Sequence, residues 1–360
     1  MSPSPITLAE LTTSRVGGPA QSLIRAETED QLIQAVTAAD AAHQPLLVLG
    51  GGSNLLVADR GFPGTVVQIC TRGIDTLQQH DDYTVVRVAA GETWDDFVAY
   101  TVEQGLSGVE TLSGIPGLVG ATPVQNVGAY GADISESLQR IRALDRETHR
   151  VVELAADELD FGYRDSVIKR SLHDALAGTR VEHDASPRWI VLSVDFHLKH
   201  AGENAAVRYG QLAKALDVEL GSHAGLHRIR EEVIRLRTGK GMVLDPADHD
   251  TWSTGSFFTN PIVPVERTTH LPEAAPRFGA GDGMVKLSAA WLIDHAGFHK
   301  GFHLDHGRAS LSTKHTLALT NRGEASTEDL LEVARTVRDG VLDHWGIELR
   351  PEPVLVGVTF

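Results

Sequence analysis

The sequence predicts a mixed α/β protein built from more than one domain. Its 360 residues exceed the usual length of a single domain. Short apolar runs typical of strands alternate with longer segments that place their apolar residues on one helical face. Hydrophobic residues make up 42% and charged residues 22% of the chain, which is ordinary for a globular protein with real cores.

The charge and the cysteine content exclude several classes of partner. The net charge of −16 argues against a nucleic-acid partner, because phosphate backbones are bound by clustered lysine and arginine. Cys70 is the only cysteine, so no intrachain disulfide can form and a reducing compartment is expected. Residues 1–10 lack the features of a secretion signal, and no apolar run is long enough to cross a bilayer. We therefore expect a cytoplasmic protein with no membrane partner.

The first region reads as a small α/β unit. Thr28 to Gln31 form a capping box that opens a helix. Leu46–Leu49 is predicted as a buried strand, residues 50–54 as a glycine turn, and Thr65–Ile69 as another strand. A glycine turn directly after a strand is a common phosphate site. It is not a dinucleotide fingerprint of the Rossmann type, because Leu55 stands where the third glycine would be.

The second region combines a helix with several strands. Thr84–Ala89 is predicted as a strand and Thr93–Gln104 as an amphipathic helix. The polar stretch from Arg180 to Arg188 is predicted as a loop. Further strands are expected at Ile141–Leu144, Val151–Leu154 and Trp189–Leu198.

Residues 113–131 link the two halves of this second region and carry five glycines, two prolines and no charged side chain. Glycine and proline make the run a poor helix, and its apolar side chains make it a poor disordered linker. It is therefore expected to be a packed, irregular loop. One interpretation is a backbone nest that closely approaches a pyrophosphate. The other is a tight structural connection, and the run alone does not separate the two.

A third region is expected from about residue 220. Gly225–Arg237 is predicted as a helix that ends in a basic cluster, and Ser288–His295 as a short helix. Thr327–Trp345 is predicted as the longest helix, ended by Gly346. Strands are expected at Thr316–Thr320 and Pro351–Val358.

Three side chains are candidates for chemistry. Arg164 lies among aromatic and small residues and could grip a carboxylate in bidentate fashion; a surface ion pair is the structural alternative. Ser256, between a glycine and two phenylalanines, could donate a proton at an apolar wall, or could only cap a turn. Glu352 lies between two prolines that would aim its carboxyl group, or that only stiffen a bend.

Four histidines spaced over a short segment suggest a metal site. Gly297 and Gly301 would break a helix that placed them on one face, and no His-Glu-x-x-His motif is present. We therefore predict no metal. The histidines are His295, His299, His303 and His306.

Taken in order, these segments resemble the UDP-N-acetylenolpyruvoylglucosamine reductase family, flavoenzymes of peptidoglycan precursor synthesis. The resemblance runs from Val16 to Glu352 and rests on an ordered set of short motifs. These motifs are Val16 to Ala20, Leu49 to Leu56, Ile115 to Gly117, Gln125 to Gly131, Tyr163 to Ser166, Gly255 to Phe258, and Pro351-Glu352.

The resemblance implies a fold, a division into domains and a cofactor. The fold is the vanillyl-alcohol-oxidase (PCMH-type) FAD-binding fold followed by a C-terminal α/β substrate domain. The implied domains are 1–70 with the C-terminal strand 354–360, then 71–219, then 220–353. FAD would be bound without a covalent link, and NADPH would be the hydride donor. The implied FAD-binding residues are Gly50, Gly51, Gly52, Ser53, Asn54, Leu55, Gly114, Ile115, Gly117, Gly120, Ala121, Thr122 and Tyr130.

The resemblance also implies roles for single residues. Arg164, Ser256 and Glu352 match the catalytic positions: the first and last would polarise the substrate carboxylate, and the serine would deliver a proton. The residues implied to bind the UDP-sugar are Tyr163, Tyr209, Lys240 and Asn260. The chain departs from the family pattern in two places. The segment after Lys240 is longer than usual, and His295 stands where Gln or Glu is expected, so no role is carried over to it.

Two rival functions share parts of this pattern. An FAD-dependent sugar or alcohol oxidase of the same fold commonly tethers its flavin to a histidine near the first glycine loop, but residues 46–58 contain none. A non-enzymic flavin-binding or nucleotide-sugar-binding module would bind without turnover. We expect a monomer that acts on a small UDP-sugar.

Overall fold

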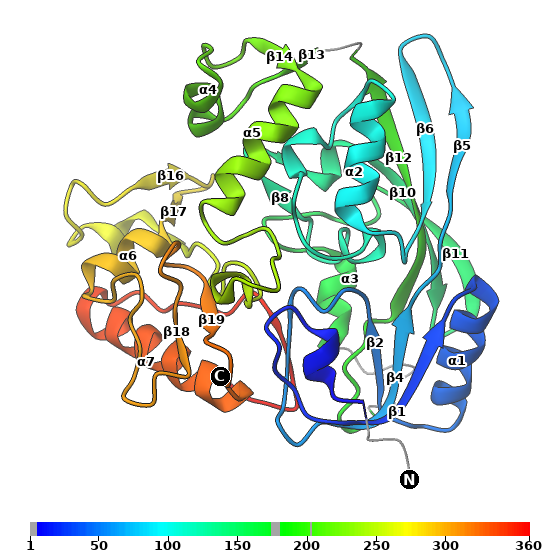
Figure 1. Cartoon of the computed structure of the whole chain (residues 1–360), viewed down its shortest axis with the longest axis horizontal. Helices are drawn as coiled ribbons and strands as arrows, with labels where there is room; N and C mark the ends of the chain where they lie inside the picture. Colours follow the sequence, from blue (N-terminus) through cyan, green and yellow to red (C-terminus); the bar gives the residue numbers. More distant parts are fainter. Residues whose placement is uncertain (1–5, 174–180, 202–203) are drawn as a thin grey trace. The chain divides into compact units, whose positions relative to one another are not determined.

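The computed structural model describes residues 6–173, 181–201 and 204–360 (Figure 1). The described residues form two compact units. The first contains residues 20–52 and 62–238, and the second contains residues 6–19, 53–61 and 239–360. The division into three domains that the sequence suggested stays a prediction.

The N-terminal part of the first unit is a parallel three-stranded sheet packed against one helix (Figure 1). The strand order is β1-β4-β2, with Leu23 of β1 and Leu47 of β2 both opposite Val66 of β4. The capping box of α1 forms as predicted, with the Thr28 hydroxyl accepting from the Gln31 N–H. The elements are β1 (Ala20–Ala26), α1 (Glu29–Ala41), β2 (Leu46–Leu49) and β4 (Phe62–Ile69).

A larger antiparallel sheet follows, and helix α2 belongs to the same unit. The strand order of this larger sheet is β11-β10-β12-β6-β5, and β7 also pairs with β12. Buried residues from both sheets, from α1 and from α2 contribute to one hydrophobic core. The strands and helices predicted for this region are confirmed. The elements are β5 (Ile74–Gln79), β6 (Tyr83–Ala89), α2 (Trp94–Glu103), β7 (Leu106–Ser107), β10 (Leu138–Asp145), β11 (Arg150–Ala155), α3 (Val167–Arg170) and β12 (Trp189–His200).

Residues 204–238 form a small subregion around helix α5, which belongs to the first unit. The sequence placed this helix in the third region, whereas the structure groups it with the first unit. Its apolar side chains Ile229 and Val233 pack with α4 and with Tyr130, and Arg230 forms an ion pair with Asp95 of α2. Residues 181–188 form no helix or strand, as predicted, whereas residue 180 lies outside the described residues. The elements are β13 (Asn204–Ala206), α4 (Gly210–Leu216), β14 (His223–Gly225) and α5 (Leu226–Thr238).

The second unit is built around the long helix α7, which has the predicted bounds and ends at Gly346 in the left-handed conformation. Strand β20 pairs in parallel with β3, so the C-terminal residues lie beside residues 55–57. Two predicted strands are shorter than expected: residues 316–317 form a turn before β19, and β20 covers only Val354–Val356. The elements are β3 (Leu55–Val57), β15 (Ile262–Pro264), β16 (Arg277–Gly279), β17 (Met284–Leu287), α6 (Ala289–His295), β18 (Ala309–Leu311), β19 (Leu319–Asn321), α7 (Thr327–Trp345) and β20 (Val354–Val356).

The remaining regular segments are short. Two small strands, β8 (Gly128–Ala129) and β9 (Ala132–Asp133), pair with each other. Among the described residues, no helix combines the length and the apolar character needed to cross a bilayer. The 3₁₀ helices are η1 (Leu8–Leu11), η2 (Glu110–Leu112), η3 (Val119–Ala121), η4 (Ile134–Glu136), η5 (Ser171–His173), η6 (His249–Thr251) and η7 (Val265–Thr268).

The buried carboxylate of Asp329 fixes the start of α7. It accepts hydrogen bonds from the Ser326 N–H at 2.8 Å and hydroxyl at 2.9 Å, and it forms a bidentate pair with Arg308. The Arg308 guanidinium, helped by Ser326, holds the pKa of Asp329 well below its usual value, although burial opposes ionisation. The ionised carboxylate therefore contributes its full stabilisation of the fold above about pH 4, the usual pKa of aspartate in an unfolded chain. This contribution is lost as the pH falls from there through the depressed pKa of the folded protein.

We expect Asp329→Asn to lower the melting temperature of the protein at neutral pH. The lost capping box alone is worth about 0.3–1.5 kcal/mol. The gap in melting temperature between variant and wild type should begin to shrink below about pH 4, where the carboxyl group of the unfolded chain takes up a proton, and should close only below the depressed pKa of the folded protein. Thermal unfolding across a pH series measures this gap. Asp339→Asn on the same helix is the control, because the Asp339 side chain is 58% exposed. A gap that stays constant with pH would contradict the expectation.

Candidate active site

The glycine-rich run 113–131 lies across the start of α2, in the first unit. The Trp94 N–H donates to the Gly117 carbonyl at 3.1 Å, and the Trp94 indole N–H donates to the Leu112 carbonyl at 2.9 Å. The Val119 and Gly120 N–H groups donate to the carbonyls of Glu92 and Ala90. The run is thus a packed irregular loop, as predicted, and its backbone is fixed by residues 90–95.

Two glycine loops come into backbone contact in this unit. A Cβ built on Gly51 would lie 2.9 Å from the Gly117 Cα, which is closer than real Cβ atoms approach a backbone. A Cβ on Gly120 would lie 2.5 Å from the Ala90 Cβ. Gly117 itself adopts a φ of 125°, a conformation that side chains disfavour. These glycines are therefore required by close packing, and the turn after β2 and the loop 113–131 form one surface.

The guanidinium of Arg164 is bound to the same loop. Its Nη2 donates to the Gly128 carbonyl at 2.8 Å and its Nη1 to the Asn126 carbonyl at 3.3 Å. Arg164 has a φ of 55°, an uncommon conformation for a residue with a side chain, and it lies 5.6 Å over the ring of Tyr163. Strained backbone held by several contacts is typical of functional sites. Its partners in these contacts are backbone carbonyls of the glycine-rich loop.

A buried arginine lies behind the loop. Arg237, near the end of α5, is 8% exposed. Burial lowers the pKa of its guanidinium to about 10; Tyr130 and Asp95 oppose that shift, and the like charge of Arg164 adds to it. Burial also raises the pKa of the Tyr130 hydroxyl. The ring of Tyr130 packs edge-to-face on Tyr209, with centroids 5.6 Å apart, so the predicted cofactor and substrate tyrosines are in contact.

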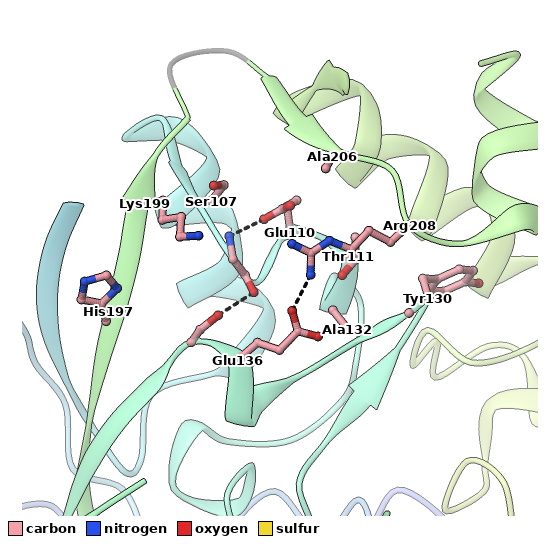
Figure 2. A pocket seen from close by; sticks show the side chains of 13 residues that line it. Ser107, Glu110, Thr111, Tyr130, Ala132, Glu136, His197, Lys199, Ala206 and Arg208 are labelled. Carbon is pink, nitrogen blue, oxygen red and sulfur yellow. Dashed lines mark hydrogen bonds and ion pairs between the residues drawn. The ribbon is translucent and has the colours of Figure 1, made fainter. Parts of the chain in front are cut away.

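A pocket of about 130 Å³ is lined in part by Tyr130 (Figure 2). Tyr130 and Arg208 form one side of it and Lys199 the other, with the buried Glu110 at the back. The Arg208 guanidinium forms an ion pair with Glu136 at 2.7 Å. This pair ties the segment that precedes Tyr209 to the 3₁₀ helix η4, which follows the glycine-rich loop.

The second unit holds Ser256 and Glu352 close together. Ser256 forms a bridge with Ala318, and the next residue, Phe257, accepts the Glu352 N–H on its carbonyl at 2.8 Å. The backbone on each side of Ser256 is thus held between two other segments of chain, while Phe257 is 1% exposed and anchored in the core. Both Ser256 and Glu352 are partly exposed. They are positioned by backbone pairing between residues about 96 apart, which no local pattern reveals.

The predicted substrate residues are divided between the units. Tyr163 and Tyr209 lie in the first unit and are 40% and 42% exposed. Lys240 and Asn260 lie in the second, and the Asn260 side-chain oxygen accepts from the Ala289 N–H at the start of α6. The structure therefore brings together Arg164, Tyr130 and Tyr209 in one unit. The predicted cofactor residues are divided in the same way. Those in the second unit are Ser53, Asn54 and Leu55. Those in the first unit are Gly50, Gly51, Gly52, Gly114, Ile115, Gly117, Gly120, Ala121, Thr122 and Tyr130.

The donor set of the first unit fits FAD. The two glycine loops present main chain with no charged side chain between residues 113 and 131, which suits a pyrophosphate and a flat ring. Arg164 and Arg237 supply positive charge beside the loop, although the chain as a whole is strongly acidic. The residues present are thus those that a dianionic dinucleotide needs.

Comparisons with known proteins agree with this reading of the residues. A family model described as an FAD binding domain matches residues 20–155, and one described as the C-terminal domain of UDP-N-acetylenolpyruvoylglucosamine reductase matches residues 245–356. The reductase of that name from Saccharopolyspora erythraea is 53% identical over 97% of this chain and 94% of its own. The one from Cutibacterium acnes is 50% identical over 98% of this chain and 90% of its own. The chain belongs to the UDP-N-acetylenolpyruvoylglucosamine reductase family.

A solved member of this reductase family is also similar in fold. The crystal structure of the enzyme from Thermus caldophilus is 25% identical, covers 98% of each chain and has a TM-score of 0.64. The predicted fold class, an FAD-binding fold followed by a C-terminal α/β domain, is confirmed. The family resemblance stated from the sequence is confirmed as well.

The histidine-rich segment of this reductase family member has separate local partners. The His295 ring stacks on Trp291 with centroids 4.0 Å apart, and His299 lies 3.0 Å from an oxygen of Asp294. His303 contacts the carbonyl of Leu304. Within the described part of the chain, no three His, Cys, Asp or Glu side chains are grouped as a metal ion would require.

Sequence reasoning missed Asp95, Arg230 and the role of Arg237. An acidic residue in the first turn of a helix is common because it suits the helix dipole, so Asp95 gave no separate signal. Arg237 was noted only as part of a basic cluster, and its burial depends on how α5 packs in the first unit.

Proposed function

We propose that this protein reduces UDP-N-acetylenolpyruvoylglucosamine to UDP-N-acetylmuramate, using bound FAD and NADPH as the electron donor. Full-length similarity to reductases of that name carries the proposal. The FAD-binding match over residues 20–155 and the paired glycine loops support the cofactor. The reaction belongs to peptidoglycan precursor synthesis, and hence to cell-wall growth and division.

The cofactor would be held by both glycine loops. Gly50 to Leu55 and residues 114–122, with Tyr130, are the proposed binding segments. When bound, FAD supplies two-electron chemistry that passes the equivalent of a hydride from NADPH to the substrate. The protein's contribution is to place the reacting atoms, to exclude water and to move one proton.

The chemistry of the enol ether assigns roles to three side chains. Reduction of its double bond adds a hydride equivalent to the terminal carbon and a proton to the carbon that bears the carboxylate. Negative charge develops on that carboxylate before the proton arrives. Arg164 would bind it with its planar fork, and Glu352 in its acid form would donate a hydrogen bond to it. Ser256 would deliver the proton, which is feasible because the acceptor is a strong base held in place.

The remaining proposed residues bind the UDP-sugar. Lys240 supplies a positive charge for the diphosphate, and Tyr163 and Tyr209 offer exposed aromatic rings with hydroxyl groups. The Asn260 oxygen is engaged by the Ala289 N–H, so its NH₂ is the end that would donate to the uracil. We further propose a monomer in the cytoplasm, where UDP-sugars and NADPH are available. The three-part division at residues 70 and 219 belongs to the same proposal.

An anaerobic stopped-flow experiment tests the function. The purified protein should be yellow, should bleach on mixing with NADPH, and should regain its colour when the enolpyruvyl substrate is added. Bleaching without recovery on that substrate would reject the proposed reaction. Failure to bleach would favour a binding module. Flavin that stays with the pellet after acid precipitation would favour a covalent oxidase.

A further inference from the structure

Asp95, in the first turn of α2, contacts the glycine-rich loop directly. Its Oδ1 accepts the Gly114 N–H at 2.5 Å. Gly114 is buried and has a φ of 70°, so its N–H direction is set by a conformation that few other residues adopt. With the two bonds from Trp94 to Leu112 and Gly117, the first turn of α2 holds residues 112–117 at three points.

The same carboxylate is bound to helix α5. Arg230 donates to Asp95 from Nη1 at 2.6 Å and from Nη2 at 2.8 Å, a bidentate pair across 135 residues of sequence. The side chains are only 17% exposed for Arg230 and 33% for Asp95. Helices α2 and α5 pack on each other in this unit (Figure 1). The partly buried, bidentate pair therefore has a fixed geometry, unlike most ion pairs at a surface.

The carboxylate is ionised at neutral pH. Burial works against ionisation, but the hydrogen bonds from Arg230 and Gly114 and the charge of Arg237 outweigh it, so the pKa of Asp95 lies below its usual value. An ionised acceptor makes a stronger bond to the Gly114 N–H than a neutral one would.

We infer that Asp95 is a positioning residue that fixes the Gly114 end of the cofactor loop to α5 through Arg230. The inference rests on the proposed function, because it assigns Gly114 to a loop that binds FAD. Asp95 does not touch the reacting atoms; it sets where one loop N–H and its neighbours lie. Loss of this contact should lower FAD affinity more than it lowers the stability of the fold.

Two substitutions of similar size separate the loop contact from the ion pair. Asp95→Asn keeps an oxygen that can accept the Gly114 N–H but loses the charge, whereas Asp95→Leu loses both. Losing a hydrogen bond to a charged group and leaving a buried donor costs enough to expect about a tenfold weaker FAD affinity for Asp95→Leu. For Asp95→Asn, the loss of FAD affinity should be several-fold smaller than for Asp95→Leu. Arg230→Gln should resemble Asp95→Asn.

The readouts are the FAD dissociation constant, from titration of folded apoprotein, and the melting temperature of the apoprotein. Arg235→Gln is the matched control, because Arg235 lies on the same helix, pairs with Glu232 and has a side chain that is 66% exposed. A purely structural role predicts equal FAD affinity for Asp95→Asn and Asp95→Leu at matched stability, and that result would overturn the inference. Wild-type protein that binds no FAD would instead overturn the proposed function.

Discussion

Ser256→Ala should leave the reduction of bound flavin by NADPH unchanged and slow its reoxidation by the enolpyruvyl substrate by roughly 10²–10³-fold. Removing one positioned donor costs about that much in comparable sites. The substitution removes only the hydroxyl, because the segment is held by backbone bonds of Phe257 to Leu317 and Glu352. Stopped-flow measurement of the two half-reactions separates them.

A second variant and a control sharpen the Ser256 test. Ser256→Cys replaces the hydroxyl by a thiol, which still carries a proton at that position, and should recover part of the lost rate of flavin reoxidation. Thr259→Val removes a hydroxyl of the same segment that donates to the Arg350 carbonyl at 3.5 Å, and it should alter neither half-reaction. Equal slowing of both half-reactions by Ser256→Ala, or no slowing at all, would contradict the proton-donor role.

The elements that the sequence predicted well carry their own local signals. Helix α7 has its predicted bounds because an amphipathic stripe runs from a capping box to a glycine stop. Strand β5 gave no signal, because five of its six residues are exposed and it is held by pairing with β6. The strand expected at 316–320 starts late, because the Ser312 hydroxyl accepts the N–H groups of Lys314 and His315 and turns the chain there.

Contacts between distant residues were beyond reach of the sequence. The amphipathic pattern of α5 showed that one face would be buried but not against which partner. Its partners include Asp95, 135 residues from Arg230, and Tyr130, roughly a hundred residues from Ile229. The glycine loops were predicted because their composition excludes most other structures, whereas the closeness of Gly51 to Gly117 depends on how β2 and α2 are arranged. Composition thus indicated the kind of site, and packing determines its geometry.

The two glycine loops provide the second large effect. Gly51→Ala should weaken FAD binding and lower the melting temperature of the apoprotein, because the new Cβ would press on the Gly117 backbone. Overpacking of this kind costs about 1–3 kcal/mol of folding stability. Gly50→Ala should weaken FAD binding alone, because its Cβ would meet protein atoms only at ordinary contact distances of 3.7–3.9 Å.

The difference between these neighbouring glycines distinguishes packing of the protein from approach of the cofactor. Gly279→Ala in β16 is the control, because no atom lies within 4 Å of its added Cβ, and it should change neither quantity. Fluorescence titration of the apoproteins with FAD and thermal unfolding without FAD provide the two measurements. If Gly50→Ala bound FAD as tightly as the wild type, the turn after β2 would have no close contact with the cofactor at that position.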